Sequence, residues 1–266
     1  MIVVNSNKIN KPFDFIATSF AANLSDTYNI SIRQQPDGYY FCIKNTNNEC
    51  IAIKYITSEH TTPSLLSNDT LLKLNYQSIT YIGYGPFIIV PKSLITNNNY
   101  STFLPIEKNL QLRAKNIVNP INEDTIIVSY TNQWTLPNKP TIIKHHEIEV
   151  LASMALNSPK QNSIWAEITS QHINIVVIHN HKLHLANTYP ITSNNDAAYY
   201  ILACYQQLNL SQEETELNIM GNTLYINPIP FLTDYIRHIN TPKPLNWNAE
   251  LPNQCAQLFT LQTTQI

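Results

Sequence analysis

Four histidines that lie close together in the sequence are the densest group of candidate metal ligands. They are His172, His179, His181 and His184. Three imidazoles with an open fourth position can hold a catalytic zinc ion. Successive residues of a strand point to opposite faces, however, and no Cys, Asp or Glu lies among these histidines. We therefore expect an exposed polar hairpin end and predict no metal, with a His-based metal-binding domain as the weaker alternative.

Carboxylates are the groups that two-metal nuclease chemistry needs, several of them around one point. Glu167 alternates with apolar residues along a predicted strand, so its side chain should face away from theirs, next to Trp165. Asp196 follows Ser193 in the Ser-x-x-Asp form of a capping box, which marks the start of a helix. Because each carboxylate has a structural explanation, we predict no catalytic residue.

Glycines limit phosphate binding, because backbone N–H groups approach a phosphate closely only where no Cβ intervenes. The chain has 4 glycines, namely Gly38, Gly83, Gly85 and Gly221. It lacks a Walker-type Gly-x-x-x-x-Gly-Lys-Ser sequence, a Gly-Gly pair and a Gly-x-Ser-x-Gly nucleophile turn. The Pro-Asp-Gly segment at 36–38 is better explained as a tight hairpin turn.

Composition argues against several classes of partner. Among 266 residues only 13% are charged, the net charge is −2, and no basic run could meet a nucleic-acid backbone. No Lys/Arg-rich amphipathic stretch, signal peptide or long apolar run indicates a membrane. The four cysteines form no Cys-x-x-Cys pair, and we interpret them as reduced, mostly buried thiols of a cytoplasmic protein: Cys42, Cys50, Cys204 and Cys255.

The elements that would position these residues follow the same order twice. Alternating apolar residues and turn signals predict three strands, a helical stretch and a fourth strand ending in glycine. In the first half these are strands at 29–35, 39–45 and 50–56, a helix opened by Pro63, and a strand at 78–83. In the second half they are strands at 163–169, 172–179 and 182–189, a helix after the capping box, and a strand at 216–220.

The remaining segments extend this pattern. We predict further strands at 88–91 and 125–130 and a helix at 146–157, which the Asn157-Ser158-Pro159 sequence ends. Asn227-Pro228 should open a last helix, whose apolar stripe runs to Ile239. A three-strand meander followed by a helix and a strand opens the ribonuclease-H-like fold. We therefore predict an α/β (α+β) chain of two such halves, 1–158 and 159–266, which together make an actin-like ATPase fold.

The sequence also resembles an uncharacterised, Bacteroidetes-type family of unknown function with a degenerate actin-like ATPase fold. The resemblance covers the second half well and the first half loosely. It lies in Leu183-His184-Leu185-Ala186-Asn187-Thr188-Tyr189, Asp196-Ala197-Ala198-Tyr199-Tyr200-Ile201-Leu202, Gln207-Leu208-Asn209-Leu210 and Met220-Gly221, with a weaker match at 24–40. It implies a fold and no activity, because the family has none assigned.

Three turns depart from what an actin-like ATPase uses to hold a nucleotide. Such enzymes wrap phosphates with glycine-rich turns and hold Mg²⁺ through aspartates. In the first turn Pro36 removes a backbone donor. The matching turn, Ser170-Gln171-His172, has neither an acid nor a glycine, and Met220-Gly221-Asn222 lacks an aspartate. We therefore predict no bound cofactor.

Together these observations predict a non-catalytic cytoplasmic interaction or assembly protein that has lost its nucleotide-binding motifs. Its partner would be a protein, and its oligomeric state is not predicted. The alternative is a divergent ATPase or sugar-phosphate-handling enzyme that uses a cleft between the halves. An open cleft lined by Asp37, Glu167 or backbone amides would favour this enzyme, whereas a cleft filled by side chains would count against it.

Overall fold

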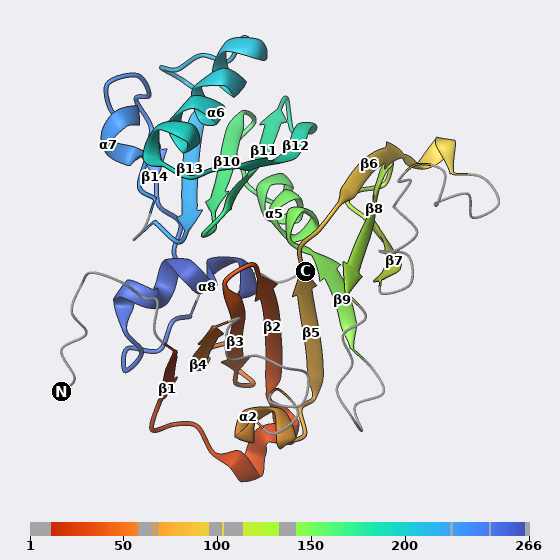
Figure 1. The fold of residues 1–266 in the computed structure, drawn as a ribbon, viewed down its shortest axis with the longest axis vertical. Coiled ribbons are helices and arrows are strands. Elements are labelled where there is room, and N and C mark those ends of the chain that lie inside the picture. The colour runs from red at the N-terminus through yellow and green to blue at the C-terminus, as the bar shows by residue number, and fades with distance from the viewer. Residues whose placement is uncertain are drawn as a thin grey trace.

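The described residues form three sheets with helices packed between and around them. The computed structural model describes residues 12–57, 69–95, 114–132, 142–223, 226–244 and 246–263, with Leu66 and Phe103. Two larger sheets lie one above the other, and helices α5 and α8 lie between them (Figure 1). We call the six-stranded sheet and its helices the first lobe, and the five-stranded sheet and its helices the second lobe.

The first lobe is built on the sheet order β1-β4-β3-β2-β5-β9. Strands β2, β3 and β4 form the predicted antiparallel meander, and β5 returns parallel to β2. The strand bounds are β1 Phe13–Ile16, β2 Asn29–Gln35, β3 Gly38–Lys44, β4 Cys50–Thr57, β5 Ser78–Gly83 and β9 Ile143–His146. Strands β1 and β9 are additions that the sequence did not predict.

The second lobe repeats this plan with the order β12-β11-β10-β13-β14. Its meander is antiparallel, and β13 returns parallel to β10 just as β5 returns to β2. The bounds are β10 Ser163–Ile168, β11 His172–His179, β12 Lys182–Pro190, β13 Glu216–Gly221 and β14 Ile239–Asn240. The predicted order of meander, helix and strand is therefore confirmed in both lobes.

A small third sheet projects from the side of the first lobe (Figure 1). It has the order β6-β8-β7, with β6 Phe87–Pro91, β7 Ala114–Pro120 and β8 Thr125–Asn132. Val90, Ile126 and Val128 form its buried core. The sequence predicted two of its strands and missed β7.

The helices begin where local capping chemistry predicts. Helix α6, Asn194–Gln207, has Ser193 as its N-cap, and the Ser193 hydroxyl accepts from the Asp196 N–H at 3.2 Å. The Asp196 carboxylate accepts in return from the Ser193 N–H at 3.0 Å, which confirms the capping box. Helix α5, Glu147–Leu156, begins after His146, as predicted. Helix α2, Thr70–Lys73, is the described part of the stretch opened by Pro63, which itself lies outside the described residues.

The last predicted helix is wrong in extent. Asn227 does accept from the Ile229 N–H at 3.2 Å, but helix α7 covers only Ile229–Leu232. Ile239 lies in β14, where it pairs with Leu217 of β13. Strand pairing with the edge of β13 thus replaces the last part of the predicted helix.

Helix α8, Ala256–Thr263, was not predicted, and it connects the two lobes. It contacts β2 and β3 of the first lobe, β13 of the second lobe and helix α5. The Gln262 side-chain amide donates to the Ser31 and Tyr40 carbonyls at 3.1 and 3.0 Å. The division into units 1–158 and 159–266 stays a prediction, and residues beyond 158 help to cover the first sheet.

Apolar packing occupies both faces of both larger sheets. Ile164 and Ala166 of β10 pack with α6 on one face, whereas Trp165 packs with α5 on the other. The first sheet packs against α2 on one face and against α8 on the other. All four cysteines are buried and free, as predicted. Within the described ranges, no helix has the length and apolar character needed to cross a bilayer.

Candidate functional site

A buried cluster of charged side chains joins the two lobes. Arg33 of β2 donates through Nη1 to the Glu167 carboxylate of β10, and through Nη2 to Glu147 Oε2 at 3.0 Å. Their relative exposures are 3%, 1% and 1%. His172 of β11 adds a contact of 2.7 Å between its Nε2 and Glu147 Oε1. We call Arg33, Glu147, Glu167 and His172 the inter-lobe cluster.

Neutral side chains complete the hydrogen bonds of the two carboxylates. The Gln35 amide donates to Glu147 Oε2 at 2.8 Å, and the Asn174 amide donates to Glu167 Oε2 at 3.1 Å. Every oxygen of both carboxylates therefore has a partner. A buried carboxylate is tolerated in a protein only when it is paired and hydrogen-bonded in this way.

The pairing favours the charged forms of Glu147 and Arg33. Burial alone would raise the pKa of the Glu147 carboxyl, but the hydrogen bond from His172 and the charges of His172 and Arg33 outweigh it and hold that pKa below its usual range. Burial would likewise lower the pKa of Arg33, but Glu167 and Glu147 raise it above its ordinary value. The buried pair of Arg33 and Glu147 is thus a charged contact within the structure.

Strand alternation explains why Arg33 and Glu167 meet. Ile32 of β2 and Ala166 of β10 point into the outer cores of their lobes, so the next residue of each strand points to the space between the lobes. Arg33 is the fifth residue of β2, and Glu167 is the fifth residue of β10. Each of these strands is the first strand of its meander. The predicted face of Glu167 is therefore confirmed, but the partners Arg33 and Glu147 were missed. For Arg33, its charge opposite to that of Glu167 at the matching strand position was the signal that could have revealed it.

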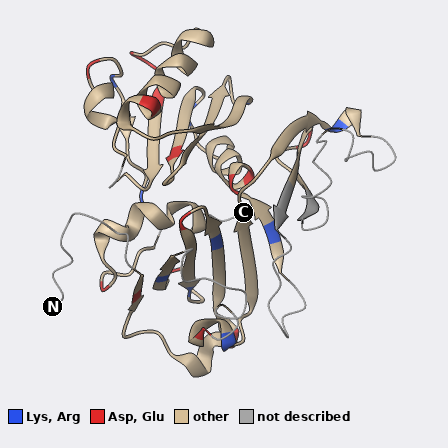
Figure 2. Cartoon of the chain, in the orientation of Figure 1, with Lys and Arg blue, Asp and Glu red and all other residues tan. Residues whose placement is uncertain are grey.

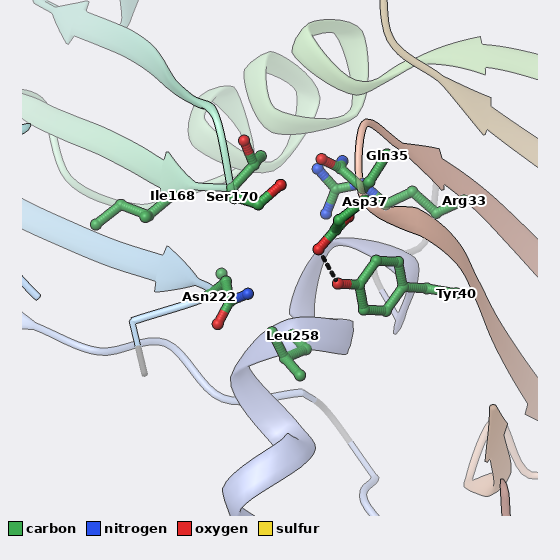
Figure 3. A pocket seen from close by; sticks show the side chains of 10 residues that line it. Arg33, Gln35, Asp37, Tyr40, Ile168, Ser170, Asn222 and Leu258 are labelled. Atoms are coloured by element: carbon green, nitrogen blue, oxygen red, sulfur yellow. Dashed lines mark hydrogen bonds between the residues drawn. The ribbon is translucent and has the colours of Figure 1, made fainter. Parts of the chain in front are cut away.

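Beside the cluster, two hairpin turns enclose a small cavity (Figure 3). Its volume is about 20 Å³, which is room for about one water molecule. Asp37 and Gln35 line it from the turn between β2 and β3, and Ser170 and Asn222 line it from the second lobe. Asp37 accepts a hydrogen bond of 2.9 Å from the Tyr40 hydroxyl, and burial raises the pKa of Asp37.

A larger open hollow lies on the other side of these turns. It has a volume of about 320 Å³, and Glu147, His172, Tyr84 and Pro36 are among its lining residues. The Tyr84 ring stacks on the His172 ring with centroids 6.1 Å apart. Glu167 lines neither this hollow nor the smaller cavity. Of the two acids that we considered for a catalytic cleft, only Asp37 therefore lines a cavity between the lobes.

The four predicted histidines do not converge. His172 belongs to the inter-lobe cluster, whereas the rings of His179 and His184 lie 5.1 Å apart at the other end of β11. His181 occupies the turn with a φ of 58°. Among the residues that the structure describes, no three or more His, Cys, Asp or Glu side chains are arranged to hold a metal ion.

Gly221 has a structural role at the edge of the small cavity. Its φ is +93°, and a Cβ at this position would lie 2.2 Å from the carbonyl oxygen of Ile168. Strands β10 and β13 therefore approach each other here more closely than any side chain allows. This close approach is a structural reason for a glycine at position 221, and it requires no bound phosphate.

We expect His146 to make the stability of the chain depend on pH. Its Nδ1 accepts from the Ile148 N–H at 3.2 Å as the cap of α5, and its Nε2 donates to the Gly85 carbonyl at 3.0 Å. The contact at Nδ1 requires a neutral ring, because a protonated Nδ1 cannot accept, whereas the contact at Nε2 forms in either protonation state. Burial lowers the pKa of His146. As pH falls below about 6.5, the unfolded chain binds a proton before the folded chain does. The free energy of unfolding should therefore decrease from that pH downward.

The variant His146→Asn tests this effect, because Asn is also a good N-cap but does not titrate. We expect urea unfolding at a series of pH values to show a shallower decline for the variant than for the wild-type chain between about pH 6.5 and 5. Identical pH profiles would show that His146 is not the responsible group.

Solved structures show which class of fold the two lobes define. A Bacteroides thetaiotaomicron protein described as having an actin-like ATPase fold and unknown function is 17% identical, with a TM-score of 0.69 over 92% of this chain and 97% of that one. The PilM–PilN type IV pilus biogenesis complex contains a chain that is 10% identical, with a TM-score of 0.56 over 88% and 96%. The predicted actin-like ATPase fold is thus confirmed.

The family of the chain is shown by its sequence. The profile described as "Protein of unknown function (DUF3822)" matches residues 17–239, and the chain belongs to this family. The resemblance to a family of unknown function with this fold is therefore confirmed. No curated protein sequence matches the chain.

Proposed function

We propose that this chain is a non-catalytic cytoplasmic interaction or assembly protein, built on an actin-like ATPase fold without a working nucleotide site. The inter-lobe cluster is the observation that carries the proposal. Arg33 reaches across from β2 to Glu167 and Glu147, so protein side chains occupy the space beside the two facing turns. An arginine that is already paired with two buried carboxylates has no free positive charge to offer a phosphate.

Two further observations support the absence of nucleotide chemistry. The cavity between the turns, at about 20 Å³, has room for about one water molecule and is too small for a phosphoryl group. Charged residues are sparse and scattered over the described parts of the fold (Figure 2).

The PilM–PilN structure shows that a similar fold occurs in a protein complex, which supports a protein partner by analogy of fold.

Calorimetric titration with Mg-ATP tests this proposal. We expect no heat of binding at micromolar to millimolar nucleotide. The midpoint of thermal unfolding should also be unchanged by a large excess of Mg-ATP, since a ligand at a hundred times its dissociation constant would stabilise the chain by about 2.7 kcal/mol. A clear micromolar dissociation constant would contradict the proposal.

The open hollow of about 320 Å³ keeps an enzyme as the second candidate. Its size lies within the range of small-molecule sites, and His172 and Glu147 on its wall are hydrogen-bonded to each other. A divergent ATPase or sugar-phosphate-handling enzyme would use these groups. Binding of a sugar phosphate that is lost in His172→Ala but retained in His181→Ala would favour this candidate over the first.

A further inference from the structure

Five buried polar atoms around the small cavity between the lobes have no hydrogen-bond partner among the residues that the structure describes. They are Arg33 Nε, Gln35 Oε1, Asp37 Oδ1, Ser170 Oγ and Asn222 Oδ1. Buried polar atoms are nearly always satisfied, and each one left without a partner costs about 1–3 kcal/mol. Such a concentration around one cavity indicates that a small polar species completes the site. Figure 3 shows these side chains facing the same space from both lobes.

The kinds of atom identify the charge of that species. Gln35 Oε1, Asp37 Oδ1 and Asn222 Oδ1 can only accept hydrogen bonds, the Ser170 hydroxyl can do either, and Arg33 Nε is the single obligatory donor. One water molecule has only two hydrogens, so it would leave at least one of the three acceptors unsatisfied. A cation is attracted to each of these oxygens.

The formal charges around the cavity also favour a cation. The buried region holds three carboxylates, those of Glu147, Glu167 and Asp37, beside the guanidinium of Arg33 and the imidazole of His172. Asp37 lines the cavity and is the acid that Arg33 does not pair with. A buried region with surplus negative charge is stabilised by a further positive charge.

We propose that this cavity binds one monovalent cation of about the size of sodium. Its oxygen ligands would come from Gln35 and Asp37 of the first lobe and from Ser170 and Asn222 of the second. Divalent ions are disfavoured because Asp37 is the one carboxylate that the described residues bring to the cavity, whereas calcium takes six to eight oxygens and usually several carboxylates. Because the ligands come from both lobes, the ion stabilises the closed arrangement of the lobes.

Thermal unfolding in different chloride salts at equal ionic strength tests the proposal. Compared with choline chloride, sodium chloride should raise the unfolding midpoint in a saturable way, by about 3 °C at ten times the dissociation constant. Potassium, which is larger, should raise it less. Equal midpoints in sodium and choline would overturn the proposal, and stronger stabilisation by Mg²⁺ or by K⁺ would overturn the assignment to a sodium-sized monovalent ion.

Two variants locate the ion. Asp37→Asn keeps an oxygen for the Tyr40 hydroxyl but removes the charge, and Ser170→Ala removes one ligand. Both should lose most of the difference between sodium and choline. Glu213→Gln is the matched control, because Glu213 pairs with Arg237 on the surface and should leave the difference intact. A sodium effect of wild-type size in both Asp37→Asn and Ser170→Ala would place the ion elsewhere and overturn the site.

Discussion

Replacing Arg33 by Met should lower the free energy of unfolding by about 3–5 kcal/mol, the largest effect expected of a single charged residue in this fold. The variant leaves Glu147 and Glu167 buried, each 1% exposed, without their shared counter-ion. An uncompensated buried charge is much more costly than the intact ion pair is stabilising. Urea unfolding followed by circular dichroism would measure the loss.

A surface pair supplies the control for this prediction. Arg237 pairs with Glu213 at 3.2 Å, but both side chains are about two-thirds exposed or more. Arg237→Met should therefore cost less than about 1 kcal/mol. Adding Glu147→Gln and Glu167→Gln to Arg33→Met should recover much of the lost stability, because the buried charges are then gone. A loss below about 1 kcal/mol for Arg33→Met would show that the cluster does not hold the lobes together.

Phe259→Ala should lower the free energy of unfolding by a similar amount, about 3–5 kcal/mol. Phe259 lies on α8 and is fully buried. The centroid of its ring lies 5.9 Å from that of Tyr40 and 6.1 Å from that of Trp247. Removing the ring leaves a cavity between α8 and the first sheet, which the surrounding strands fill only in part. The same urea experiment would measure this loss.

The exposed Phe231 of α7 is the matched control. It is 48% exposed, so Phe231→Ala should change the stability by about 0.5 kcal/mol or less. Similar losses for the two variants would mean that α8 does not pack on the first sheet as described.

Local patterns predicted the two meanders because those patterns are nearly sufficient on their own. Strand β2 alternates Ile30 and Ile32 with polar residues and runs directly into a Pro-Asp-Gly turn, so its pairing with β3 is decided within a short segment. Helix α8 gave no comparable signal. It is buried against both lobes, so even Gln262 and Thr263 lie inside, and an amphipathic period cannot appear without an exposed face.

The site was predictable only in part, for a related reason. The alternation of β10 identified the face on which Glu167 lies, but not what that face meets. Arg33 is 134 residues away in sequence from Glu167 and 114 from Glu147. No local rule connects residues at such distances. Only the packing of the two lobes reveals that these charges meet.

The contacts of α8 have a consequence for how the chain folds as it is made on a ribosome. Gln262 donates to Ser31 and Tyr40, which precede it by 231 and 222 residues. At about 5–20 residues per second, the β2–β3 hairpin waits roughly 10–45 s after synthesis before this helix is complete. Throughout that interval one face of the first sheet stays uncovered. The second lobe can therefore finish its outer core before α8 covers the inner face of the first sheet, although the first lobe is synthesised earlier.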